Sequence, residues 1–178
     1  MERVIAPKIE ELDNLELHQV AEKLELAAPK YSLDCVNWEK DFPYHPITVF
    51  SIAHSSKYIY VNFFVRCNYQ RAVNASHRKD RKHPTRLNEA EINSIKRIAS
   101  CGKRPFQELE GLFNWSLLIA IPLELIGMDG AQMPVTIKGN FYKCASATSM
   151  PHYLSHFPIV SEKPNFHCPE FFGDIVLE

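Results

Sequence analysis

Four side chains near the C-terminus are the first whose types and spacing could do chemistry. His152 and His156 form an H-x-x-x-H pair, and His167 directly precedes Cys168. On a helix, the H-x-x-x-H spacing would bring two imidazoles within reach of one zinc ion. One proline stands immediately before His152 and another two residues after His156, and this placement disfavours a helix. The sequence therefore predicts loop histidines, and we assign no metal site.

Covalent and acid–base catalysis find little support in the same region. Cys168 precedes a proline, and no glycine-rich turn accompanies it to bind an oxyanion. Glycoside hydrolysis would need two carboxylates, such as Glu170 and Asp174, facing one cleft about 5–10 Å apart. A lone glutamate is more often an ion-pair partner. We assign no catalytic residue, and a glycoside-processing enzyme stays as the alternative function.

The middle of the chain contains a strongly basic run. SHRKDRKHPTR, residues 76–86, holds five Lys or Arg residues and two histidines. Such a run could bind phosphates, but isolated charge runs are more often solvated loops, and no aromatic residues interleave with this one. We therefore predict no nucleic-acid partner.

Composition and charge describe one domain of ordinary globular make-up. The 178 residues are 46% hydrophobic and 23% charged, with a formal net charge of −1, so disorder and a global attraction to nucleic acid or anionic lipid are excluded. Five widely spaced cysteines without a C-x-x-C pair indicate buried thiols in a reducing compartment. No stretch predicts a signal peptide or a membrane span. We expect a soluble, cytoplasmic protein with no membrane partner.

The elements that must position any site begin with a helix and continue as strands. Residues 15–25 predict a helix capped by Asn14, within an N-terminal helical extension over residues 1–30. Short apolar segments separated by proline and polar residues then predict strands. These segments are residues 47–52, 58–66, 115–121, 135–142 and 174–177. Together they predict an all-β, antiparallel β-sandwich over residues 31–178.

The first two predicted strands are expected to form a hairpin. Segments 47–52 and 58–66 flank the polar AHSSK. The odd-numbered residues of the second segment, from Ile59 to Val65, fall on one face, and aromatic and polar residues share the other. We expect the first face to be core and the second to be amphipathic.

One segment interrupts the strand pattern. Residues 87–100 predict a single inserted helix, capped by Asn88 with Glu91 at the reciprocal position. In that helix Ile92, Ile95 and Ala99 would face inward.

The last forty residues are dense in aromatic side chains within segments that should be loops. Such rings can plug the end of a sandwich, which would make the domain a structural or interaction module. They can also form platforms for the apolar face of a sugar ring. Composition leaves both uses open.

A series of short motifs runs through the chain. The terminal set is NFYKC, PHYLS, FPI, KPNFH and PEFFG, preceded by DCVNW, FPYHP, IAHSSKYIYVNFFV, RAVNA, SIKRIAS and WSLLIAIP. Together they resemble the carbohydrate-binding family 9-like proteins of Bacteroidetes, over nearly the whole chain. The resemblance implies a jelly-roll-like β-sandwich that binds sugars without cleaving them. It also associates the chain with carbohydrate catabolism, as an accessory of polysaccharide degradation.

The resemblance further implies a binding site. A sugar would stack on loop aromatics while polar side chains hydrogen-bond its hydroxyls. The ring-bearing candidates are Tyr153, His156 and Phe157, and the candidate hydrogen-bond partners are Asn140, Tyr142 and His152. The expected partner is a carbohydrate. No cofactor is assigned, although the resemblance allows a calcium ion without naming its ligands.

The sequence departs from the family pattern in two places. Between RAVNA and SHRKDR the relatives carry two further strands that are absent here, and His156 stands where they have a tryptophan. The loss of two interior strands would leave unpaired edges and uncovered core. We expect re-paired strands, a second copy of the chain covering the edges, or native residues beyond this sequence.

Overall fold

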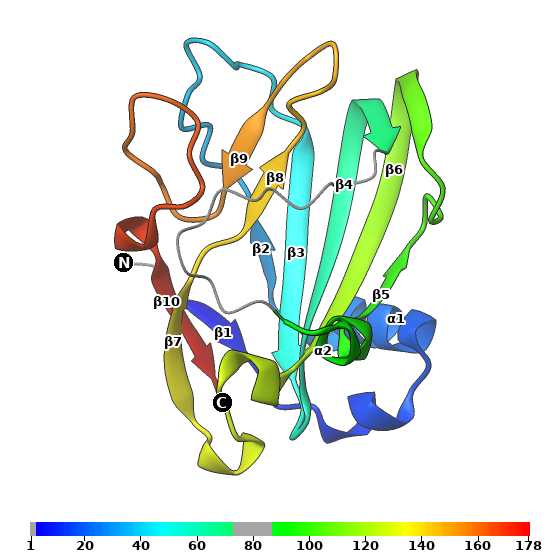
Figure 1. The fold of residues 1–178 in the computed structure, drawn as a ribbon, viewed down its shortest axis with the longest axis vertical. Coiled ribbons are helices and arrows are strands. Elements are labelled where there is room, and N and C mark those ends of the chain that lie inside the picture. The colour runs from blue at the N-terminus through cyan, green and yellow to red at the C-terminus, as the bar shows by residue number, and fades with distance from the viewer. Residues whose placement is uncertain (1–2, 73–86) are drawn as a thin grey trace.

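Strands dominate the computed structural model, which describes residues 3–72 and 87–178 (Figure 1). A five-stranded antiparallel sheet has the order β2-β3-β4-β6-β5, a smaller sheet has the order β1-β10-β7, and β8 pairs with β9. The strands are β1 (Val4–Ala6), β2 (Lys30–Ser32), β3 (Ile47–His54), β4 (Tyr58–Ala72), β5 (Lys96–Ala99), β6 (Phe106–Pro122), β7 (Val135–Gly139), β8 (Tyr142–Cys144), β9 (Tyr153–Ser155) and β10 (Gly173–Leu177).

Helical elements are short and lie between the strands. They are η1 (Glu10–Asn14), α1 (Leu17–Ala27), α2 (Glu89–Ser94), η2 (Leu123–Ile126), η3 (Gly130–Gln132) and η4 (Pro169–Phe171). Within the described residues, none is long and apolar enough to cross a membrane.

The main hydrophobic core lies between one face of the five-stranded sheet and the smaller sheets. Phe50 and Ile52 of β3 and Val61 of β4 pack there against side chains from β1, β9 and β10. Ile59, Val61 and Phe63 all belong to this cluster, so the predicted core face of the second strand is confirmed. The layered, mostly β architecture agrees with the predicted antiparallel sandwich.

Helix α1 covers part of the opposite face of the large sheet. Its buried Val20 and Leu24 pack against Tyr60 and Leu118, which belong to β4 and β6. The face predicted to be amphipathic is therefore buried where the helix crosses it. The helix begins at Leu17, two residues later than predicted, because Glu16 and not Asn14 forms the capping box.

The first thirty residues also contribute a strand to the domain. β1 pairs in parallel with β10, and its Val4 and Ala6 are fully buried. The N-terminal segment therefore supplies part of the main core as well as a helix.

The predicted hairpin forms, and β4 is paired on both sides. β3 pairs with β4 from Ile59 to Arg66, and β6 pairs with it from Tyr58 to Ala72. β6 takes the place next to β4 directly, so β4 has no unpaired edge between Ile59 and Arg66. Covering that edge therefore needs no second copy of the chain.

The helix predicted over residues 87–100 is half strand. The cap at Asn88 is confirmed, with Glu91 bonded reciprocally, but α2 ends at Ser94. Residues 96–99 then pair with β6 as β5, and Ile92 is 46% exposed instead of facing inward. Strand pairing along the open edge of β6 outweighs the weak helix preference of this segment.

The strand predicted over residues 135–142 divides between two sheets. β7 ends at Gly139 and pairs with β10, whereas Tyr142 begins β8 and pairs with β9. The break between them falls at Asn140, whose side chain accepts from the backbone N–H of Phe141. This change of sheet brings the segment after Tyr142 toward the far ends of β4 and β6, where Lys143, Cys144, Ala145 and Thr148 line a pocket.

Candidate functional site

The antiparallel pair of β4 and β6 extends beyond the strands on either side of it. β3 reaches β4 only as far as Arg66, whereas the β4–β6 ladder continues to Ala72 and Phe106. Trp115 lies directly opposite Val65, and opposed residues in an antiparallel pair share one face. Val65 has the parity of the core-facing residues, so Trp115 also lies on that side of the sheet. Register shifts after Cys67 then re-aim the side chains at the end of β4.

A pocket of about 160 Å³ lies between this extension and the segment that follows β8. We call it the Trp115 pocket. Three rings and several hydrogen-bonding side chains line it, and none of its lining residues is an aspartate or glutamate. The lining residues are Tyr69, Gln70, Arg71, Cys101, Phe106, Trp115, Lys143, Cys144, Ala145 and Thr148.

Lys143 enters the pocket wall from β8 and is only 8% exposed. Its Nζ contacts Nε2 of His152, which is completely buried. The Nδ1 of His152 lies 2.9 Å from the carbonyl oxygen of Met150. Because that carbonyl can only accept, Nδ1 carries the hydrogen and Nε2 is the acceptor for Lys143.

The same burial changes the protonation of both groups. Desolvation lowers the pKa of Lys143 to about 8. Desolvation, reinforced by the nearby Lys143, lowers the pKa of His152 to about 4. At neutral pH His152 is therefore neutral and Lys143 is mostly charged.

Tyr44 packs against both His152 and Tyr69. The ring of Tyr44 meets His152 edge-on at 5.1 Å and Tyr69 at 5.9 Å between centroids. Its hydroxyl accepts from the backbone N–H of Asn68 at 2.7 Å. Tyr44 thereby fixes one ring that lines the pocket and the imidazole that contacts Lys143.

Two polar contacts connect the opposite walls. Arg71 donates through Nη1 to the carbonyl of Ala147 at 2.8 Å. Glu108 accepts from the N–H and the hydroxyl of Ser149, at 2.7 and 2.6 Å. These hydrogen bonds, with lesser contributions from other groups, hold the pKa of the Glu108 carboxyl below its usual value. The loop between β8 and β9 is thus fastened to both long strands.

Comparison with known proteins identifies the family. The sequence profile of carbohydrate-binding family 9 matches residues 18–83 and 74–177. The chain belongs to carbohydrate-binding family 9. Its fold is similar to that of a "putative carbohydrate-binding protein" from Bacteroides uniformis ATCC 8492, at 28% sequence identity and a TM-score of 0.87, over 99% of each chain. No curated protein matches the chain.

None of the six residues predicted for the sugar site of this family 9 domain lines the Trp115 pocket. His152 lies behind the pocket wall, where it accepts from Lys143. Its position is that of a residue that orients Lys143, since its ring has no exposed face.

Three of the predicted residues form what we call the C-terminal plug, made of Asn140, His156, Phe157 and Gly173. Phe157 is 7% exposed and belongs to the main core. The side-chain amide of Asn140 donates to the carbonyl of Phe157 and accepts from its N–H, each at 3.0 Å. His156 Nδ1 bonds the carbonyl of Ser32 at 2.8 Å. Asn140 and Nδ1 of His156 thus have partners within the protein, Nε2 of His156 is buried without a hydrogen-bond partner among the described residues, and the buried Phe157 ring offers no stacking platform.

The other two predicted residues belong to an aromatic cluster on the outer side of β8 and β9. Tyr142 stacks on Phe166 with centroids 4.4 Å apart, and Tyr153 meets Trp38 and Phe42 edge-on. Both tyrosines are half-buried, and desolvation raises the pKa of each hydroxyl. They share a cluster with each other through Phe166 but not with His156 and Phe157.

The functional residues that sequence reasoning missed had only indirect signals. Trp115 is the first residue of the strand predicted over residues 115–121, which forms part of β6. Arg71 and Lys143 fall within RAVNA and NFYKC, the motifs that carried the family resemblance. Nothing in those motifs shows that the two cations meet Trp115, because the pocket depends on the turn of the chain between β7 and β8.

Metal-ligand spacing does not produce a metal site in the described residues. They contain no group of three or more His, Cys, Asp or Glu side chains that could hold an ion. The H-x-x-x-H segment is not helical, and ring nitrogens of His152 and His156 bond backbone carbonyls. The basic run over residues 76–86 lies outside the described residues.

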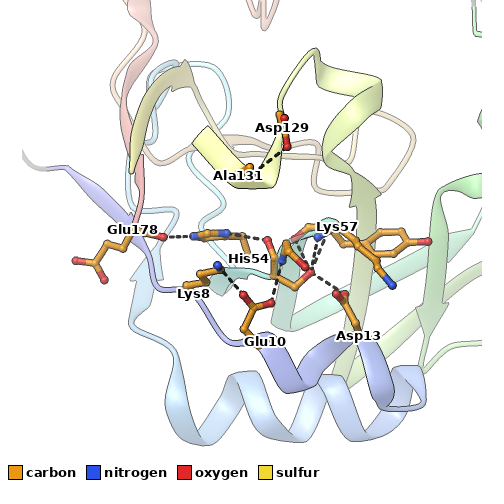
Figure 2. Close-up of polar contacts among 11 residues, drawn as sticks. Lys8, Glu10, Asp13, His54, Lys57, Asp129, Ala131 and Glu178 are labelled. Carbon is orange, nitrogen blue, oxygen red and sulfur yellow. Dashed lines mark hydrogen bonds and ion pairs between the residues drawn. The ribbon is translucent and has the colours of Figure 1, made fainter. Parts of the chain in front are cut away.

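A polar cluster joins the N-terminal segment to the turn between β3 and β4 (Figure 2). The buried His54 has Nε2 2.6 Å from the backbone oxygen of Glu178 and Nδ1 3.0 Å from that of Ser55. Ser55 donates its hydroxyl to Asp13 at 2.6 Å, and Tyr60 does so at 2.9 Å. Histidine, serine and aspartate are thus neighbours, but the imidazole contacts backbone oxygens and not the serine hydroxyl. This geometry ties chain segments together and is not that of a catalytic triad.

Proposed function

We propose that this family 9 domain binds a carbohydrate without cleaving it, in the Trp115 pocket. Family membership and the similar fold of the Bacteroides protein support carbohydrate binding. The observation that carries the location is that Trp115 shares one small pocket with two cationic side chains, Arg71 and Lys143.

The chemistry of the lining suits a sugar ring. An indole or phenol face packs against the apolar C–H face of a pyranose, and this contact supplies most of the affinity. Directional N–H groups from Arg71, Lys143 and Gln70 distinguish the hydroxyls on the ring edge. At 160 Å³ the pocket is smaller than the roughly 300–1,000 Å³ of pockets for drug-sized ligands, which favours one ring. We expect a Kd between about 1 μM and 1 mM.

Binding without cleavage agrees with the placement of the carboxylates. The Trp115 pocket has no acidic lining residue that could protonate a leaving group. Of the two acids considered for hydrolysis, Asp174 forms ion pairs with Lys138 and Arg3. The hydrogen bond from Lys138 is the main cause that lowers the pKa of Asp174, so this carboxyl is not protonated near neutral pH. A glycoside-processing enzyme would need a pair of acids elsewhere.

The two tryptophans of the chain allow a direct test. Trp115 lines the pocket, whereas Trp38 is buried in the aromatic cluster and donates to the carbonyl of Ser161. Trp38→Phe leaves Trp115 as the reporter, and Trp115→Phe leaves Trp38. Each variant would be titrated with neutral and acidic mono- and oligosaccharides, with calorimetry in parallel.

We expect a binding sugar to change the fluorescence of Trp38→Phe and to leave that of Trp115→Phe unchanged. A response only from Trp38 would move the site to the cluster of Tyr142 and Tyr153. Uniformly absent heat and fluorescence change, with circular dichroism showing folded protein, would contradict carbohydrate binding.

A further inference from the structure

Lys143 is the most buried lysine of the described residues, and it has no carboxylate partner among them. Its amine contacts the neutral acceptor nitrogen of His152. Lys8, Lys23 and Lys138 are more exposed, yet each pairs with an aspartate or glutamate. Removing an ammonium group from water is costly unless an opposite charge accompanies it. The pocket wall therefore holds a cation that no described residue neutralises.

Arg71 adds hydrogen-bond donors beside this cation. One N–H of Arg71 donates to the carbonyl oxygen of Ala147, and a guanidinium has five N–H donors. Glu108 accepts with both oxygens from Ser149 and also interacts electrostatically with Arg71, so it offsets part of the Arg71 charge and leaves Lys143 as the cation without a counter-charge among the described residues. The pocket is thus locally basic, although the whole chain has a formal net charge of −1.

We propose that the sugar bound in the Trp115 pocket carries a single negative charge on its ring, as a uronate does. This inference rests on the proposed function. One unneutralised buried cation matches one anionic group, and Arg71, already engaged with Ala147, supplies further donors at the edge. A carboxylate at C6 accepts from both cations while the C–H face of the same ring packs on Trp115. The small volume requires that ring and acid belong to one residue.

Partial burial makes this interaction selective. Charge-assisted hydrogen bonds are about twice as strong as neutral ones. A neutral sugar would place a hydroxymethyl group beside Lys143 and leave its charge without compensation. The lowered pKa of Lys143 agrees with an ammonium group that has no counter-charge among the described residues of the unliganded protein and gains one from the ligand.

The test compares sugars that differ at one carbon. Methyl glucuronoside is titrated against methyl glucoside, and methyl galacturonoside against methyl galactoside, by calorimetry at pH 7 and low salt. We expect at least tenfold tighter binding of one uronate than of its neutral counterpart. Equal affinities would overturn the inference and leave the proposed function intact. Binding of none of the four would defeat both.

A phosphorylated and a sulfated sugar complete the panel. A sugar phosphate is doubly charged near pH 7. We expect it to bind less tightly than the uronate, because Lys143 is the one buried cation of the pocket that lacks a counter-charge in the described part of the chain. Tighter binding of the phosphate would overturn the assignment of a single charge. A sulfate ester that matches the uronate would retain the single charge and replace the carboxylate.

Variants separate a binding role of Lys143 from a structural one. Lys143→Met is expected to abolish the preference for the uronate, to keep binding of the neutral sugar, and to raise the thermal unfolding midpoint of the unliganded protein. Lys138→Met, on β7, is the matched control and should keep the preference. Arg71→Gln provides a second variant and should reduce the preference several-fold. A preference unchanged in both Lys143→Met and Arg71→Gln would contradict the proposal.

Discussion

The Trp115 pocket and the C-terminal plug both combine rings with polar side chains, but the polar side chains differ in the partners that the protein gives them. In the plug, Asn140 binds both backbone groups of Phe157, and the Phe157 ring packs into the core. In the pocket, Lys143 has a neutral histidine as its contact and no carboxylate among the described residues. In the plug, Nε2 of His156 is buried without a hydrogen-bond partner in the described structure, but no charged group of its four residues is left without a counter-charge, whereas Lys143 leaves an ammonium group in the pocket wall for a ligand to pair with.

This difference teaches which aromatic residues indicate a binding site. The ring-bearing residues that the sequence predicts for the sugar site, Tyr153, His156 and Phe157, all lie in the plug or in the neighbouring cluster. Ring density alone does not separate closure of a core from recognition of a sugar. A ring beside a buried charge that the protein itself leaves without a counter-charge is the more informative signal.

The largest expected effect is on stability, in the plug. Phe157→Ala should lower the free energy of unfolding by about 3–5 kcal/mol, because it opens a cavity in the main core. Urea denaturation followed by circular dichroism measures it. Gly173→Ala tests the same packing from the other side, since a Cβ there would lie 2.3 Å from the Phe157 ring. Sugar affinity of the folded fraction should stay unchanged in both; a tenfold loss would place the site in the plug.

A matched pair of tyrosines sharpens the comparison. Tyr69 lines the pocket, whereas Tyr153 packs on Trp38 and Phe42 in the outer cluster. Tyr69→Ala should weaken sugar binding about 10- to 30-fold, from the loss of ring contact worth about 1.5–2 kcal/mol. Tyr153→Ala should lower stability and leave affinity within twofold. Titration calorimetry of both variants decides, and the reverse pattern would restore Tyr153 as the stacking ring.

Much of the fold could be predicted because it depends on local patterns. The alternation in β4 follows from period-two hydrophobicity, and the cap at Asn88 follows from its spacing to Glu91. β5 could not be predicted in this way. Its residues are compatible with a helix, and only the open edge of β6 selects a strand.

The candidate site was harder to predict because its defining property is not local. Lys143 stands next to Tyr142, which was predicted as a contact, and His152 was predicted too. The side-chain alternation along β8 turns Lys143 toward the pocket and Tyr142 toward the outer cluster. That Lys143 is buried without a counter-charge depends on every segment around it, and no spacing rule contains this information.

The pH dependence of uronate binding tests the charge of the pocket. Lys143, whose pKa burial lowers to about 8, must be protonated to bind an anion. Affinity should therefore be constant between about pH 6 and 7 and fall up to tenfold per pH unit above pH 8, while the pKa of Lys143 rises in the complex. Calorimetry across this range measures the decline.

The other titratable groups around Lys143 define the controls for that profile. His152 is neutral throughout the range, because its pKa is lowered to about 4. Cys67 and Cys144 interact electrostatically with Lys143, so Cys144→Ser and Cys67→Ala should retain the decline. Lys143→Met should abolish it. A decline of equal size for a neutral sugar would show that the pH effect concerns folding or the thiols and not the anion.

The smallest expected effect comes from the contact that joins the two walls of the pocket. Glu108 accepts twice from Ser149, and Glu108→Gln replaces its charged acceptor with a neutral amide. Because the side chain is only half-buried, we expect about a two- to threefold loss of sugar affinity, chiefly through faster dissociation. The hydrogen bonds from Ser149 lower the pKa of Glu108 in the folded protein. Their contribution is therefore complete at a pH above the pKa that Glu108 has in the unfolded chain, and it is lost as the pH falls through the lower pKa of the folded protein. Stopped-flow dissociation rates of Glu108→Gln and of Glu110→Gln on the same strand should therefore differ at pH 7 and converge in acid. Equal rates at pH 7 would show that the loop keeps its position without this contact.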